Sequence, residues 1–92
     1  MAKFKLGKLA WTRGVSDLIA DNPNFASFVL KSQKRYAGGD WGDCCEEDKA
    51  ANDHALIDGS RIIGVYKNDR WKIWIITEAD RSCTTILFPE EY

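Results

Sequence analysis

The segment from Trp71 to Thr77 most tightly limits what this chain can fold into. Its side chains alternate, so that one face of an extended strand carries Trp71, Ile73 and Ile75 and the other carries Lys72, Trp74 and Ile76. A strand with apolar side chains on both faces lies inside a sheet and is covered on both sides, at least in part. We therefore predict a central strand here.

The flanking segments extend this strand into a sheet. Residues 61–66 and 83–88 are rich in β-branched and apolar side chains, and polar turns at 67–70 and 78–82 separate them from the central strand. Short polar connections favour antiparallel hairpins. The pattern predicts a three-stranded antiparallel β-meander, with a possible edge strand at the N-terminal alternation Phe4-Lys5-Leu6.

Three short helices are expected before the meander, at about residues 14–20, 23–36 and 44–57. Thr12 can cap the first, and Asn22 followed by Pro23 is typical of a helix start. Asp43, with Glu46 three residues later, has the spacing of a capping box for the third helix, with Asp in place of Ser or Thr. The predicted fold class is α+β.

The composition supports a single folded domain over residues 1–92. Hydrophobic residues make up 45 % of the chain and aromatic residues 12 %, which is enough for a core and excludes intrinsic disorder. The longest apolar run, Ile73–Ile76, is too short to cross a membrane, and no signal-peptide pattern follows the basic start. An odd number of cysteines does not make a secreted disulfide framework. We expect a cytoplasmic protein without membrane partners.

Charge is distributed unevenly along the chain. Residues 1–36 hold seven basic and two acidic side chains, whereas residues 40–58 hold seven acids and one lysine, and the net charge is −1. A general nucleic-acid binder would carry a basic excess, so this class is disfavoured. The basic residues near the start lack a nucleic-acid motif and are expected to form a solvated edge: Lys3, Lys5, Lys8 and Arg13.

The acidic segment is the first candidate site, formed by Asp40, Trp41, Asp43, Glu46, Glu47 and Asp48. It has three interpretations. The carboxylates could bind a divalent cation, although the alternating pattern of a calcium loop is absent. They could simply favour the positive end of a helix. They could also meet a basic partner or mimic nucleic acid. Trp41 either pins the loop to the core or is an exposed interface anchor.

A second candidate site joins the last two strands. Glu78 and Arg81 lie in the turn, and Arg61 and Tyr66 on the neighbouring strand could reach the same sheet surface. A base and cationic groups on a sheet are what a metal-independent ribonuclease would need. The simpler interpretation is a turn closed by an ion pair of Arg81 with Glu78 or Asp80.

The cysteines and the single histidine do not match a metal or catalytic motif. Cys44 and Cys45 are adjacent, whereas zinc sites separate paired cysteines by two or more residues. Cys45 and His54 lie on opposite sides of the expected helix and cannot react together. We therefore expect Cys44, Cys45 and Cys83 to be small core fillers, His54 to be a surface residue, and no metal or cofactor to be bound.

The second half of the chain resembles a family of short bacterial proteins often labelled "plasmid-related protein" and found with mobile elements. The resemblance covers about residues 39–92 and is carried by Gly39-Asp40-Trp41-Gly42-Asp43, Glu46-Glu47-Asp48, Asn52, Gly59, Arg61-Ile62, Tyr66, Lys72 to Ser82 and Thr84 to Tyr92. It implies carriage by plasmids or integrated elements and action on host machinery, including host defence. It implies no particular activity.

These observations favour a non-enzymatic interaction module. The expected partner is a host or element-encoded protein, bound through the Asp40–Asp48 segment, within a host defence or nucleic-acid-processing complex. One alternative is a small metal-independent nuclease or nucleotide-processing enzyme that uses Glu78, Arg81, Arg61 and Tyr66. The other is a protein that sequesters a nucleotide signal.

Overall fold

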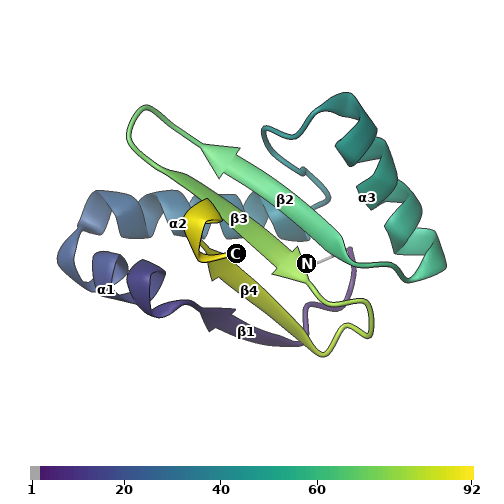
Figure 1. Ribbon diagram of the computed structural model, residues 1–92, viewed down its shortest axis with the longest axis horizontal. Coiled ribbons are helices and arrows are strands. Elements are labelled where there is room, and N and C mark those ends of the chain that lie inside the picture. The colour runs from purple at the N-terminus through teal and green to yellow at the C-terminus, as the bar shows by residue number, and fades with distance from the viewer. Residues whose placement is uncertain (1–2) are drawn as a thin grey trace.

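Four strands form one mixed sheet in the order β1-β4-β3-β2 (Figure 1). The computed structural model describes residues 3–92. β2–β3 and β3–β4 are antiparallel, as the meander prediction requires, whereas β1 runs parallel to β4. The fold is α+β as predicted, but its sheet is larger than the predicted meander. The strands are β1 (Lys8–Trp11), β2 (Ile62–Lys67), β3 (Lys72–Thr77) and β4 (Cys83–Leu87).

The predicted edge strand at Phe4–Leu6 is wrong in position. Phe4 lies in a bend, Lys5 and Leu6 belong to no strand, and the strand forms later, at β1. Phe4 packs its ring against Tyr36 and Trp41 instead, at centroid distances of 5.4 and 5.9 Å. Gly7 then adopts a φ of 66° where a Cβ would collide with the backbone before β4. The alternation at Phe4–Leu6 therefore reflects packing rather than strand pairing.

The first two helices begin where their caps predict. The Thr12 hydroxyl accepts the N–H of Val15 at the start of α1 (Arg13–Asp21). The Asn22 side chain accepts two N–H groups at the start of α2 (Pro23–Ala37). α3 spans Glu46–Asp58 and ends at Gly59, whose left-handed φ of 82° suits glycine. A short 3₁₀ helix, η1, spans Pro89–Glu91.

The predicted capping box of α3 is wrong. Cys45 occupies the N-cap position and makes no side-chain cap. Asp43 turns toward β2 instead, where its carboxylate accepts the N–H of Lys67 at 3.0 Å and its own N–H donates to the carbonyl of Val65. Gly42, with a φ of 80°, bends the chain so that the segment follows the edge of β2. The Asp43 carboxylate therefore binds the edge of β2 and does not cap α3.

The main core lies between the sheet and α2, which crosses behind it (Figure 1). Phe25, Val29 and Tyr36 of α2 are fully buried with the alternating side chains of β3, including Ile73 and Ile75. The other face of β3 carries Trp74 and Ile76, so the predicted central strand is confirmed. η1 lies in front of β3 on this second face, and α3 flanks β2 (Figure 1).

Candidate binding groove

The outer edge of β2 is closed by α3 and the loop before it. The Asn52 side chain bonds to both the N–H and the carbonyl of Ile63. The N–H of Val65 donates to the carbonyl of Trp41 at 3.1 Å, and the carbonyl of Val65 accepts from Asp43. These bonds hold α3 at a fixed distance beside the second face of the sheet, which creates a groove between them.

This groove has a volume of about 350 Å³. Its floor is apolar and half-buried, formed by Ile63 and Val65 of β2 and Trp74 of β3. Its remaining lining comes from α3, the loop before it and the residue before β2: Cys44, Asp48, Ala51, Asn52 and Arg61. The arrangement is an apolar hollow with an acidic and a basic group in its lining.

The α3 side of the groove is acidic. Glu46, Glu47 and Asp48 form the first turn of the helix and are exposed, where carboxylates suit the helix dipole. Asp48 lines the groove, and Glu47 lies one helical turn before Ala51, on the same side of α3. One carboxylate therefore lines the groove, and a second lies beside it on the exposed helix surface.

The opposite border is formed by Arg61 and Tyr92. The guanidinium lies 5.6 Å from the centre of the Tyr92 ring and also donates to its hydroxyl. The same ring meets Trp74 edge-on at 5.3 Å. The indole N–H of Trp74 is buried and is the one such side-chain group within residues 3–92 that has no hydrogen-bond partner.

The loop members of the predicted acidic site have structural roles. Asp40 accepts from the Arg35 guanidinium at 2.8 Å and from the N–H of Gly42, and the Arg35 bond holds the pKa of Asp40 below its usual value. Trp41 is only 3 % exposed, and its indole N–H donates to Asp53 at 2.9 Å. Trp41 therefore pins the loop to the core, and the alternative of an exposed anchor is wrong.

The structure thus divides the six predicted partner-binding residues. Asp40, Trp41 and Asp43 shape the loop, whereas Glu46, Glu47 and Asp48 are exposed on α3, where Glu46 lies 3.8 Å from the Lys49 ammonium. The groove floor could not be recognised from the sequence, since Ile63 and Val65 look like ordinary strand residues. Their register opposite Ile76 and Trp74 is the signal that places them on the second face.

The four predicted catalytic residues do not converge. Tyr66 is buried on the α2 face, where its hydroxyl donates to the carbonyl of Asp40 and burial raises its pKa. Arg61 is exposed and borders the groove on the other face, so the expectation that both share one surface is wrong. Glu78 and Arg81 lie in the β3–β4 turn, close to Arg61 and away from Tyr66. The pairing of Ile62 with Thr77 places Glu78 beside Arg61, and the Arg81 guanidinium donates to the carbonyl of Ser60 at 2.7 Å.

Arg81 has a structural role at the end of α3. Its guanidinium donates to the carbonyls of Ala55, Ser60 and Glu78, at 2.9, 2.7 and 3.2 Å. The predicted ion pair of Arg81 with Glu78 or Asp80 is not among the ion pairs of residues 3–92. The arginine instead ties the β3–β4 turn to the helix.

The cysteines occupy different environments. Cys44 is half-buried, its thiol donates to the carbonyl of Trp41, and burial raises its pKa. Cys83 is also half-buried, but Cys45 is exposed, so its expected role as a core filler is wrong. His54 is exposed, as predicted, and lies 3.3 Å from Asp58. No metal-binding group of three His, Cys, Asp or Glu side chains occurs in residues 3–92.

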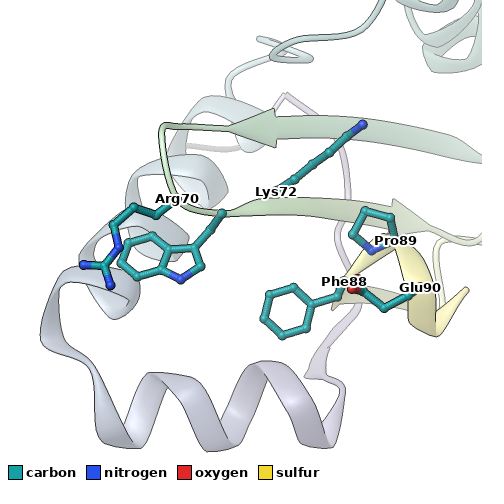
Figure 2. Close-up of a pocket in the computed structure, with 6 residues that line it drawn as sticks. Arg70, Lys72, Phe88, Pro89 and Glu90 are labelled. Atoms are coloured by element: carbon teal, nitrogen blue, oxygen red, sulfur yellow. The ribbon is translucent and has the colours of Figure 1, made fainter.

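A second hollow, of about 460 Å³, lies where the start of β3 meets η1 (Figure 2). Its lining includes Trp71 and Phe88, which belong to the aromatic cluster around Phe25. Lys72 alternates with Trp71 along β3 and extends away from Phe88 (Figure 2). The Arg70 and Lys72 side chains point in different directions (Figure 2), so the groove beside α3 is the better candidate.

Comparison with known proteins gives no assignment. No family model matches the chain. Neither the curated proteins nor the solved structures include a match. Within residues 3–92, no helix has the length and apolar character needed to cross a membrane. The assignment of the groove as a binding site therefore comes only from its geometry.

Proposed function

We propose that the protein is a non-enzymatic interaction module that binds a basic segment of a partner protein in the groove between α3 and β2. The observation that carries this proposal is the position of an apolar floor directly beside exposed carboxylates. Ile63, Val65 and Trp74 offer a surface that gains free energy when a partner covers it. Glu47 and Asp48 favour a partner that brings positive charge.

The size of the groove favours a single anchoring side chain. A volume of about 350 Å³ lies at the small end of the usual range for binding pockets. One aromatic or long aliphatic side chain could enter it and pack on Trp74. Such buried anchors carry most of the binding energy in protein interfaces. The expected binding segment thus has a large apolar residue flanked by Lys or Arg.

The cations flanking this anchor would lie over the α3 side of the groove. The carboxylates of Glu47 and Asp48 are exposed in the free protein, so pairing with them requires little desolvation. Their main effect would be to select basic segments and to speed association at low salt. Arg61 on the opposite border disfavours a second cation there, which gives the bound segment a direction.

The biological setting is proposed from the resemblance to mobile-element proteins. Proteins that bind nucleic acid carry basic surfaces, so an acid-bordered groove suits partners from that class. A component of a host defence or nucleic-acid-processing complex is the most specific candidate. In this role the module would occupy a basic surface that otherwise contacts phosphates.

Two matched variants test the groove in affinity capture from nuclease-treated bacterial lysate. Ala51 lines the groove and Ala50 does not, although both are exposed on α3. Ala51→Arg fills the groove and repels a basic segment, whereas Ala50→Arg makes the same chemical change outside it. We expect the first variant to lose the co-eluting partner and the second to retain it. Equal capture by both variants, with folding verified by circular dichroism, would refute the proposed groove.

A further inference from the structure

The two edge strands of the sheet, β2 and β1, differ in whether other parts of the chain cover their outer backbone groups. The β2 edge is covered along its length, at Ile63 by Asn52 and at Val65 and Lys67 by the loop residues 41–43. β1 forms the other edge, and no other helix or strand of residues 3–92 lies beyond it (Figure 1). Since an exposed edge is a template for pairing with another chain, β1 is the surface on which to look for a partner.

The parallel pairing of β1 with β4 determines which backbone groups face outward. The N–H of Lys8 donates to Ser82 and the N–H of Thr12 donates to Ile86, so alternate residues of β1 bond to β4. The N–H and carbonyl groups of Leu9 and Trp11 consequently face away from the sheet. Within residues 3–92 they have no backbone partner outside the strand ladder.

We propose that β1 pairs antiparallel with β1 of a second copy, so that two sheets join across a twofold axis at Ala10. Leu9 would lie opposite Trp11 of the second copy, and each pair would exchange two hydrogen bonds, giving four in total. The two Ala10 residues would then form the closely spaced pair at the axis. A small side chain suits this position, because non-hydrogen-bonded neighbours approach most closely.

The side chains match this arrangement on both faces. On the α2 face, Trp11 is 43 % exposed and would cover Leu9 of the second copy, as an aromatic–aliphatic cross-strand pair. On the second face, Lys8 would lie opposite Thr12, whose hydroxyl donates to the Glu91 carboxylate at 2.6 Å. The Lys8 ammonium is therefore placed to meet Glu91 of the second copy, and the twofold axis repeats this charge pair.

This dimer is independent of the groove, which lies at the opposite side of the sheet. Joining two copies through β1 leaves both grooves accessible, because the groove is built on β2, β3 and α3. The assembly would therefore be bivalent for the partner proposed above. Failure of the dimer would leave the groove proposal unaffected, and the reverse also holds.

Sedimentation velocity from low micromolar to near-millimolar concentration tests the proposal directly. We expect a monomer–dimer equilibrium, and a protein that remains monomeric throughout overturns it. Amide hydrogen exchange gives a second readout. The N–H groups of Leu9 and Trp11 should become protected from exchange as the protein concentration rises, whereas the other exposed amides should exchange at an unchanged rate. Dimerisation without protection of these two amides would also overturn the proposed interface.

Two pairs of variants locate the interface. Trp11→Pro removes an outward N–H that β4 does not use, so the monomer should fold while the dimer is lost. Trp11→Thr retains this N–H and should weaken the dimer without abolishing it. Lys8→Glu should raise the dimer dissociation constant about tenfold at low salt, because it replaces two attractions by repulsions. Lys5→Glu, which changes the net charge equally outside the strand, should leave it unchanged, and equal effects would contradict the pairing.

Discussion

The side chain of Asn52 pairs with the backbone of Ile63 as a neighbouring strand would. Its amide nitrogen donates to the Ile63 carbonyl at 2.8 Å, and its amide oxygen accepts the Ile63 N–H at 3.2 Å. Asn52 is buried on α3, so one side chain both closes the β2 edge and fixes the helix beside the sheet. The groove depends on this attachment.

Asn52→Ala should lower the free energy of unfolding by about 2 kcal/mol, because it leaves two backbone groups of Ile63 without partners. Chemical denaturation of the variant measures this loss. Asn24→Ala is the control, since Asn24 is exposed on α2. If the free energy of unfolding falls by less than about 0.5 kcal/mol, as is usual for surface substitutions, water must bind the Ile63 backbone groups as well as the Asn52 amide does.

Asn52→Asp is expected to be sensitive to pH. Its carboxylate can still accept the N–H of Ile63, but its second oxygen faces the carbonyl without a proton. Protonation restores a donor, so the deficit relative to the wild type should shrink as the pH falls through the carboxyl pKa. A deficit that is constant between neutral and acidic pH would contradict the assigned orientation of the amide.

A buried chain of hydroxyl groups links the two halves of the protein. The Thr84 hydroxyl donates to the carbonyl of Leu6 and lies 2.8 Å from the Thr77 hydroxyl, which in turn lies 2.7 Å from the Tyr36 hydroxyl. The Tyr36 hydroxyl also donates to the carbonyl of Ile62 at 3.2 Å. Thr84→Val interrupts this chain and should destabilise the fold by about 2 kcal/mol. Thr85→Val, on the half-buried second face, is the matched control, and similar losses in both variants would argue against the chain.

Burial raises the pKa of Tyr36 to about 12, and Thr77 only partly offsets this. Since the unfolded tyrosine titrates near pH 10, the folded protein favours the neutral phenol. The resulting stabilisation is fully present below about pH 10 and is lost between about pH 10 and 12, by roughly 2–3 kcal/mol. Denaturation at increasing pH measures this loss. Tyr36→Phe should make this part of the profile less steep and leave the loss due to Tyr66, whose pKa burial also raises. A profile unchanged by the substitution would contradict the role of Tyr36.

Arg81 has a positive φ of 60°, which permits two substitutions to be compared. Arg81→Ala loses the bonds to three carbonyls and retains an unfavourable backbone conformation. Arg81→Gly loses the same bonds but tolerates this conformation, so it should be more stable than the alanine variant by about 1 kcal/mol. Thermal unfolding of both variants tests this order. The reverse order would mean that the turn changes its conformation once the guanidinium is removed.

The sequence predicted features that depend on neighbouring residues. The alternation in Trp71–Thr77 defined the central strand, and Thr12 and Asn22 defined two helix starts, because each signal is local. The β1–β4 pairing joins segments more than 70 residues apart and has no local signature. Asp43 matched a capping box, yet its distance from β2 decides its partner, and this distance is a property of the tertiary fold.

Only the acidic part of the candidate site could be predicted from the sequence, for the same reason. Glu46, Glu47 and Asp48 are consecutive, so their charge is evident from the sequence. The floor of the groove combines Ile63 and Val65 with Trp74 from another strand, and only the sheet register brings them together. Trp41, the most conspicuous residue of the acidic segment, proved to be part of the core.

Selection of peptides from a random library on the immobilised protein examines the groove without knowledge of the natural partner. We expect the enriched peptides to carry a large apolar residue flanked by Lys or Arg. Their affinity should fall at least about tenfold in Ala51→Arg, equivalent to about 1.4 kcal/mol, and persist in Ala50→Arg. Enrichment of acidic peptides, or of peptides that bind both variants equally, would contradict the assignment of the groove as the binding site.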